Sequence, residues 1–334
     1  MTKVLVTGSE GFIGSHLTEA LVKNGYSVKA LVQYNSFSSV GWLTDLDHDV
    51  KKSLEIVFGD IRDPGFTQEL VGDVTCVLHL AALIAIPYSY VAPQNYVGTN
   101  ISGTLNLLEA SKRSGVTRFI HTSTSEVYGS AQYVPIDENH PLVGQSPYSA
   151  TKIAADQLAY SYHASFEVPV IILRPFNTYG PRQSSRAVIP TIIRQALFNN
   201  GVINLGSLTT RRDFSFVSDT ADGFLSALKA PLDLVLGQTI NLGSGFDVGI
   251  GKLVELVGEI LNRKLEINVD DVRIRPDKSE VDRLLACNKK AEELLNWTPI
   301  FQGEDGLKRG LEETISWFEK QLGDDEIPVD RYTI

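Results

Sequence analysis

The chain contains 334 residues, of which 43% are hydrophobic and 21% charged, and this composition is typical of a globular protein rather than a disordered one. Its net charge of −10 argues against nucleic acid as the main partner, because binding along a phosphate backbone requires a basic surface. No apolar run approaches the roughly 20 residues that span a bilayer, so we expect no membrane partner.

Six short apolar segments in the first half of the chain are predicted β-strands. They are Lys3–Thr7, Tyr26–Val32, Leu54–Phe58, Val74–Leu80, Arg118–Ser123 and Val168–Leu173. Amphipathic stretches at Ile13–Asn24, Asn100–Ser114 and Tyr148–Ala164 are predicted helices between them. Strands that alternate with helices at this spacing predict an α/β fold, with a Rossmann-type, doubly wound parallel sheet covered on both faces.

The composition changes after Arg174, where loops rich in proline, glycine and arginine separate short elements. This change favours a smaller C-terminal α/β domain that binds the substrate. We assign residues 1–173 and about 213–237 to a dinucleotide-binding domain, and residues 174–212 and 238–334 to the substrate domain. The acidic tail from Asp324 is expected to be partly mobile.

The cysteine and histidine content bears on compartment and on metals. Cys76 and Cys287 are the only cysteines, and such sparse use fits a reducing cytoplasm without disulfides. The chain begins in a strand pattern with no signal-peptide pattern, so we expect a cytoplasmic protein. No histidine or cysteine spacing matches a metal site, and we expect no protein-built metal centre.

A glycine-rich loop, TGSEGFIG at residues 7–14, joins the first strand to the first helix. Gly8, Gly11 and Gly14 would permit a tight turn, a close approach of the backbone to a pyrophosphate, and close packing of helix on strand. The amino terminus of the helix adds free N–H groups for the phosphates. The alternative is a turn without a ligand, but the strands that follow favour a nicotinamide dinucleotide.

The GxxGxxG spacing of this loop resembles the extended short-chain dehydrogenase/reductase family, and further segments match that family along nearly the whole chain. They are Gly59–Ile61, His79–Ala82, Asn100–Thr104, Ser123–Gly129, Tyr148–Lys152, Arg174–Pro181 and Arg212–Phe214. The resemblance implies a set of cofactor-binding residues. Besides the three glycines, Tyr148 and Lys152, these are Phe12, Ile13, Asp60, Ile61, Leu80, Ala81, Ala82, Asn100 and Phe176.

The acidic residue that usually selects NAD is missing from its expected place. A dinucleotide fold commonly has Asp or Glu at the end of the second strand, on the ribose 2′-hydroxyl. Here that place falls on Val32, followed by Gln33, and no arginine stands there for the 2′-phosphate of NADP. We favour NAD as the cofactor, and NADP stays open.

Tyr148 and Lys152 lie four residues apart and therefore share one face of a predicted helix. A tyrosine near pKa 10 is a poor base at neutral pH, and a neighbouring ammonium group would lower that pKa. Ser146 and Pro147, just before the pair, are a helix-start signal. An exposed surface pair is the alternative, but the position between the fifth and sixth strands favours a catalytic pair.

Glu126 follows the fifth strand, at the edge of the sheet where an active site is expected. The segment resembles that of nucleotide-sugar 4,6-dehydratases, in which an Asp-Glu pair follows a Thr, although here Ser125 replaces the Asp. The resemblance implies that Thr124 binds the sugar O4 and Tyr148 deprotonates it, while the C4 hydride passes to the nicotinamide. Glu126 would then remove the C5 proton. Either Glu126 or Ser125 would deliver the proton that water loss from C6 requires.

The segments 81–90, 122–128 and 174–183 resemble most closely the N-acetylglucosamine nucleotide 4,6-dehydratases of legionaminic-acid biosynthesis. This resemblance implies UDP- or GDP-N-acetylglucosamine as substrate. A nucleotide-sugar 4-epimerase, a UDP-glucuronate decarboxylase and a non-catalytic NAD(P)-sensing protein stay as alternatives. Expected substrate-binding residues are Asn177, Ala187, Val188, Arg212, Asn241 and Arg275, whereas Arg174 is expected to be structural. Family members pair two helices across a two-fold axis, which implies a homodimer.

Overall fold

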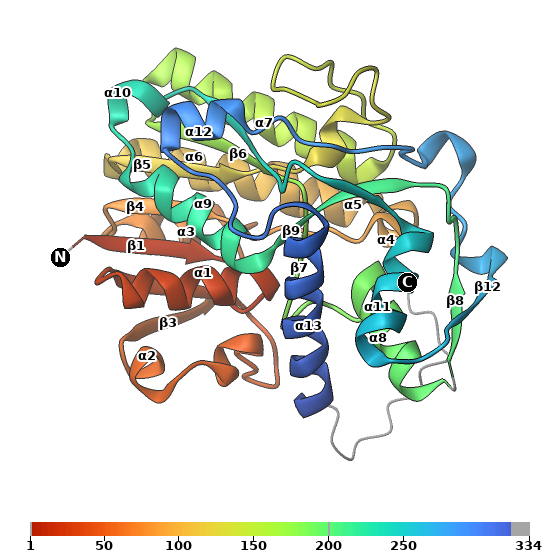
Figure 1. The fold of residues 1–334 in the computed structure, drawn as a ribbon. Helices are drawn as coiled ribbons and strands as arrows, with labels where there is room; N and C mark the ends of the chain where they lie inside the picture. The colour runs from red at the N-terminus through yellow and green to blue at the C-terminus, as the bar shows by residue number, and fades with distance from the viewer. Residues whose placement is uncertain (1, 200, 322–334) are drawn as a thin grey trace.

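A parallel seven-stranded sheet forms the centre of the protein in the computed structural model, which describes residues 2–199 and 201–321 (Figure 1). The spatial order of its strands is β3-β2-β1-β4-β5-β6-β10. Their bounds are β1 Lys3–Thr7, β2 Ser27–Gln33, β3 Leu54–Gly59, β4 Cys76–His79, β5 Arg118–Thr122, β6 Val170–Pro175 and β10 Thr239–Leu242. The predicted Rossmann-type sheet is confirmed, and β1 to β6 correspond to the six predicted strands.

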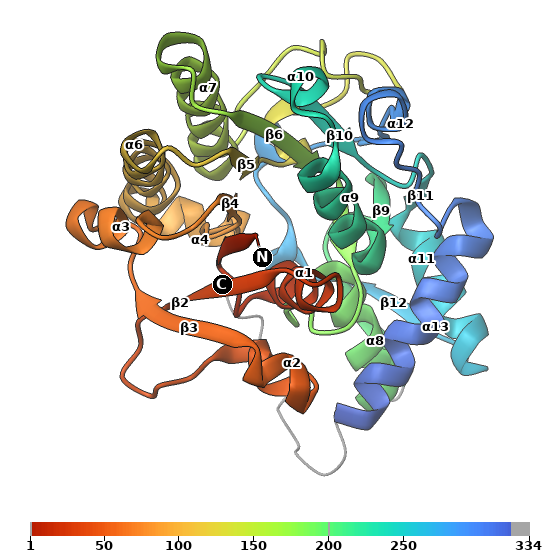
Figure 2. The ribbon, with the colours of Figure 1, turned by 90° about the vertical axis from the view of Figure 1, so that its left-hand side faces the viewer.

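Helices cover both faces of this sheet, which explains why its central strands are almost continuously apolar (Figure 2). On one face, α9 (Val217–Lys229) packs against α1 (Phe12–Lys23) and α12 (Lys289–Leu295). On the other, α6 (Gly103–Ser114) packs against α3 (Pro64–Val71) and α7 (Pro147–Phe166). Shorter helices lie in the connections: α2 His48–Lys52, α4 Ile86–Val91, α5 Pro93–Tyr96 and α10 Leu232–Val235.

A second unit with its own apolar core lies beyond the carboxyl ends of the strands. Its three-stranded sheet has the order β11-β9-β7, and a two-stranded sheet pairs β12 with β8. The strands are β7 Asn177–Tyr179, β8 Val202–Leu205, β9 Arg211–Phe216, β11 Asp247–Gly249 and β12 Glu266–Val269. Its helices are α8 Val188–Phe198, α11 Ile250–Leu261 and α13 Gly303–Gln321.

The structure moves the expected domain boundaries at two places. Thr239–Leu242, expected in the substrate domain, pairs with β6 and forms the edge of the large sheet. Residues 213–216, expected in the dinucleotide domain, belong to β9 and pair with β7 in the smaller sheet.

Two more expectations concern the C-terminal tail and the cysteines. The tail from Asp324 lies outside the described residues, and within the described ranges both cysteines are free.

Within 2–199 and 201–321, no helix is both long and apolar enough to cross a membrane. The same ranges hold no group of three or more His, Cys, Asp or Glu side chains that could bind a metal ion.

Candidate active site

The glycine loop makes a tight turn between β1 and α1 that leaves no room for larger residues. Gly8 has a left-handed φ of +68°, and a Cβ atom there would stand 3.0 Å from the backbone of Ala81. A Cβ atom on Gly14 would stand 2.0 Å from the carbonyl oxygen of Gly8. Helix α1 therefore starts directly against the end of β1, with its free N–H groups at the cavity described next.

A cavity of about 740 Å³ opens at this loop and extends between the two units of the protein. Most of the predicted cofactor residues line it. They are Gly8, Gly11, Phe12, Ile13, Gly14, Asp60, Ile61, Leu80, Ala81, Ala82, Tyr148, Lys152 and Phe176. The glycine turn, the helix amino terminus and the apolar walls fit a dinucleotide, so these residues suit the predicted cofactor.

Helix α7 brings Tyr148 and Lys152 into the cavity through a well-defined start. Ser146 caps the helix, since its side chain accepts from the backbone N–H of Ser149 at 3.1 Å while Ser149 Oγ accepts from the N–H of Ser146. Pro147 occupies the first turn, as the sequence predicted. The predicted catalytic pair is thus on one helical face, buried, and at the cavity wall.

Burial dominates the ionisation of this pair. It raises the pKa of Tyr148 well above its ordinary value, although the side-chain hydrogen bond with Thr124 acts in the opposite direction. It lowers the pKa of Lys152 to about 8, and the Nζ atom donates a 2.6 Å hydrogen bond to the carbonyl oxygen of Thr122. The expectation that Lys152 lowers the pKa of Tyr148 is therefore not met in the protein alone, because desolvation of the phenolate outweighs the other effects.

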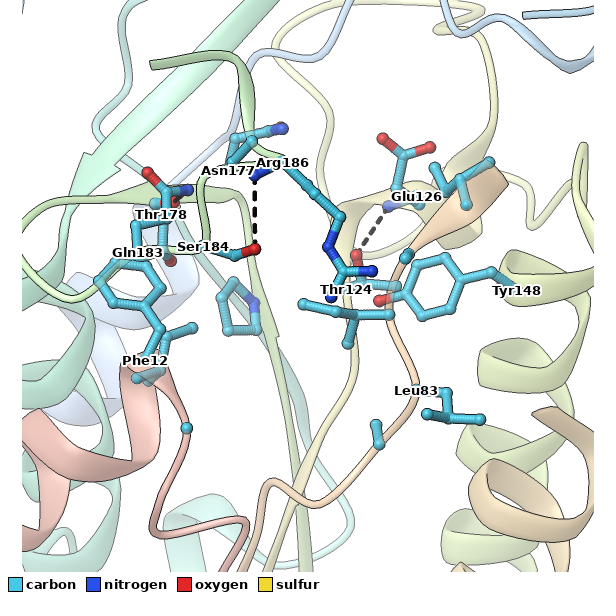
Figure 3. A pocket seen from close by; sticks show the side chains of 18 of the residues that line it. Phe12, Leu83, Thr124, Glu126, Tyr148, Asn177, Thr178, Gln183, Ser184 and Arg186 are labelled. Carbon is cyan, nitrogen blue, oxygen red and sulfur yellow. Dashed lines mark hydrogen bonds between the residues drawn. The ribbon is translucent and has the colours of Figure 1, made fainter. Parts of the chain in front are cut away.

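The turn after β5 carries the three other predicted catalytic residues. Thr124 caps the 3₁₀ turn Ser125–Tyr128, and its Oγ1 atom accepts from the N–H of Glu126 at 3.2 Å. Figure 3 shows Thr124, Glu126 and Tyr148 on one side of the cavity. Ser125 is 2% exposed, whereas Glu126 is half-buried. An acid–base group and a buried phenol thus share one wall.

Another part of the cavity wall is polar and cationic, and its Arg212 interacts electrostatically with Glu126. Arg212, on β9, is buried and forms an ion pair of 3.1 Å with Glu280, which also lies 3.6 Å from Arg275. Burial lowers the pKa of Arg212. Asn177 lies on β7, and its buried Oδ1 atom has no hydrogen-bond partner within the described part of the chain. Arg212, Arg275 and Asn177 all line the cavity, as do Ala187 and Val188 at the start of α8.

Two predicted site residues do not reach the cavity. The amide of Asn100 is buried and bonds to the backbone of Leu83 and to Thr151. The side chain of Asn241, on β10, bonds to Tyr128 and to the carbonyl oxygen of Ile136. Both amides satisfy buried polar groups inside the fold, which is a structural role, and their predicted roles in binding stay predictions.

Arg174 has the structural role that the sequence predicted. Its guanidinium group is buried and donates to Asp156 at 3.0 Å and to the hydroxyl of Tyr128 at 3.0 Å. Asp156 also accepts from Ser123 at 2.7 Å, at the end of β5. This network fixes the turn that carries Thr124 and Glu126.

The sequence analysis missed several polar residues of the cavity. Gln183, Ser184 and Arg186 lie in the loop before α8, and Glu280 lies in the segment that crosses back over the cavity. Figure 3 shows Arg186 extending toward Thr124 and Tyr148. These residues occur in irregular loops without periodicity, and only their three-dimensional position reveals them. The arginine content of the loop was the one available signal.

This chain is similar to known proteins along nearly its whole length. Residues 5–310 match the model of the family described as GDP-mannose 4,6 dehydratase. The chain belongs to this family. A curated relative, the low-salt glycan biosynthesis protein Agl12 of Haloferax volcanii, is 32% identical over 97% of this chain and 99% of its own length.

Solved structures similar to this GDP-mannose 4,6-dehydratase family member include both epimerases and dehydratases. A UDP-glucuronic acid 4-epimerase from Bacillus cereus, in complex with NAD, has a TM-score of 0.87 at 30% identity and covers 96% of this chain and 100% of its own. The dTDP-glucose 4,6-dehydratase DesIV from Streptomyces venezuelae, also with NAD, has a TM-score of 0.85 at 29% identity, covering 98% and 100%. The protein is therefore an enzyme of the NAD-dependent nucleotide-sugar dehydratase and epimerase family, and NAD is the cofactor that the sequence favoured.

Proposed function

We propose that this chain is a hydro-lyase that dehydrates UDP- or GDP-N-acetylglucosamine to the 4-keto-6-deoxy sugar. The observation that carries the proposal is the position of Glu126, which shares a cavity wall with Thr124 and Tyr148 (Figure 3). The resemblance to the dehydratases of legionaminic-acid biosynthesis supports N-acetylglucosamine as the sugar. Arg212, Arg275 and Asn177, which also line the cavity, would bind the nucleotide diphosphate.

The first step concerns Tyr148 and Thr124. Tyr148, as the phenolate, accepts the proton of the sugar 4-hydroxyl and becomes the phenol, and the hydroxyl of Thr124 hydrogen-bonds O4. When bound along the glycine loop, NAD would accept the hydride from C4 and would return the same hydride later in the reaction. Lys152, anchored on the carbonyl oxygen of Thr122, would favour with its positive charge the Tyr148 phenolate that this step requires.

The second step concerns Glu126. A ketone at C4 acidifies the C5 proton, which the carboxylate of Glu126 removes. The C5–H electron pair forms the C5–C6 double bond as the C6–O bond breaks, and the hydroxyl leaves as water with the proton from Glu126. Hydride then adds to C6 and a proton to C5. Ser125 and Glu126 both line the cavity, and we assign both proton transfers to Glu126 because a carboxyl group is a far stronger acid than a serine hydroxyl.

A second candidate function rests on Arg186. Its side chain extends toward Thr124 and Tyr148, at the sugar end of the cavity (Figure 3). A guanidinium group suits a carboxylate, so a sugar with a C6 carboxylate would fit the same place. The corresponding reaction is 4-epimerisation or decarboxylation of UDP-glucuronate.

One experiment separates these functions. The protein is incubated in deuterated water with UDP-N-acetylglucosamine, GDP-N-acetylglucosamine or UDP-glucuronate, and products are followed by mass spectrometry and proton NMR. Dehydration predicts loss of water with deuterium at C5. Recovery of a C4 epimer, or loss of CO₂ from UDP-glucuronate, would overturn the proposal. Absence of turnover despite NAD binding would favour a sensor.

Glu126→Gln tests the assignment of the base. The variant should lose dehydration by about 10²- to 10⁴-fold, because the amide cannot accept the C5 proton. It should still reduce the bound NAD in the first step, which the nicotinamide absorbance reports. Glu255→Gln, at an exposed position on α11, is the matched control and should turn over like the wild type. Normal dehydration by Glu126→Gln would show that another group is the base.

A further inference from the structure

The end of β2, where an acidic residue usually binds the adenosine ribose, carries no carboxylate in this protein. Val32 is fully buried, and β2 ends at Gln33, which lines the cavity but has a neutral side chain. Within the described ranges, the ribose end of the cavity must therefore obtain its hydrogen-bond acceptor from another segment.

Glu10, in the glycine loop, brings a carboxylate to the end of β2. It is the second residue between Gly8 and Gly11, and its side chain folds back onto the end of β2, where Oε1 accepts the backbone N–H of Gln33 at 2.9 Å. Its carbonyl oxygen accepts from the N–H of Trp42 at 3.0 Å. Glu10 is thus held from two sides, and it lines the cavity together with Gly11 and Gln33.

The second carboxylate oxygen of Glu10, Oε2, is buried and receives no hydrogen bond from the described residues. Burial raises the pKa of this carboxyl group, and only backbone hydrogen bonds counteract it. A buried carboxylate oxygen without a donor is costly, and a hydroxyl group that donates to it would remove that cost.

We propose that Glu10 is the specificity-determining residue that accepts the hydrogen bond of the adenosine ribose 2′-hydroxyl of NAD. Glu10 lies in the loop before α1 and takes the role of the carboxylate that the end of β2 lacks. A 2′-phosphate at the same place would face a negative charge held by the Gln33 backbone, so NADP is disfavoured. The inference rests on a dinucleotide bound at the glycine loop and is independent of the reaction performed on the sugar.

Binding measurements on the cofactor-stripped full chain test this role without turnover. By isothermal titration calorimetry, the wild type should bind NAD more tightly than NADP, and more tightly than NAD that lacks the adenosine 2′-hydroxyl, each by about tenfold or more. Equal affinity of the wild type for NAD and its 2′-deoxy analogue would overturn the proposal, and this readout needs no variant.

Glu10→Gln keeps an oxygen for the N–H of Gln33 but removes the charge. The variant should lose about tenfold in NAD affinity, gain in NADP affinity, and no longer distinguish NAD from the 2′-deoxy analogue. Adding Gln33→Asp should restore the preference for NAD, because it returns a carboxylate to the end of β2. Glu69→Gln, exposed on α3, is the matched control. Unchanged discrimination by Glu10→Gln would refute the assignment, whatever the outcome of the dehydration experiment.

Discussion

Lys152 is a buried amine in the middle of the candidate active site, and its ionisation makes the stability of the protein depend on pH. Burial lowers its pKa to about 8, from an ordinary value of 10.5. Between these two values the folded protein binds fewer protons at this site than the unfolded chain does. The free energy of unfolding therefore rises with pH across this window, and the penalty for burying the charged amine is complete below it.

Lys152→Met removes this dependence. Between pH 8 and pH 9.5, the wild type should gain about 1–2 kcal/mol in unfolding free energy relative to the variant, measured by urea denaturation. Lys264→Met, at a position that is 90% exposed, is the control and should follow the wild type. A constant difference between wild type and Lys152→Met across this range would show that Lys152 titrates at its ordinary value.

Individual residues also mark the limit of prediction from sequence. Tyr148, Lys152 and Glu126 were predicted because a strand end and a four-residue spacing place them. Asn100 and Asn241 do not line the cavity, and the sequence could not show this because a buried structural amide and a ligand-binding amide look alike in a sequence. Glu10 was not predicted because it stands at a position of the glycine motif to which the family resemblance assigned no role, and its contact with β2 is visible only in three dimensions.

At the scale of elements, the contact between β1 and α1 depends on the missing side chain of Gly14. Gly14→Ala would place a methyl group 2.0 Å from the carbonyl oxygen of Gly8, so α1 must move away from the loop. We expect a cost of about 1–3 kcal/mol in stability and a loss of NAD binding, measured by thermal denaturation and calorimetry.

The control for this substitution is Gly251→Ala, since a Cβ atom there meets nothing within 4 Å and the residue lies in helix α11. That variant should keep its NAD affinity and be as stable as the wild type, or up to about 1 kcal/mol more stable. An unchanged NAD affinity in Gly14→Ala would contradict the role assigned to the turn.

The elements of the large sheet differ in how well they can be predicted. Strands β1 to β6 are short apolar runs separated by amphipathic helices, and such runs are typical of strands buried on both faces. The seventh strand, β10, has four residues and includes the polar Asn241. It returns to the sheet after a long excursion of the chain into the second unit, and a connection of this kind leaves no local pattern.

At the scale of the whole molecule, no other part of the chain that the structure describes covers the outer face of α7. Ala150, Gln157 and Ala164 repeat every seven residues and are exposed, and Tyr160 beside them is 54% exposed. Helix α6 packs alongside, so the two helices present one surface. We propose that two copies of the chain pair these helices as a four-helix bundle, since small residues allow helices to approach closely.

Tyr160→Glu tests the pairing, because it places a charge in the centre of the proposed interface. By analytical ultracentrifugation, the wild type should sediment as a dimer and the variant as a monomer. Phe37→Glu, at a position that is 89% exposed in the loop after β2, should stay dimeric. A monomeric wild type would exclude this assembly.

The single cavity shared by the two units has a thermodynamic consequence. It is lined both by the glycine loop and by Arg212 of the second unit, so the dinucleotide and the nucleotide sugar would fill adjoining parts of one space. Two ligands with a common boundary change each other's affinity by the same factor, because linkage is reciprocal. The substrate concentration in the cell would thereby influence what fraction of the enzyme holds NAD.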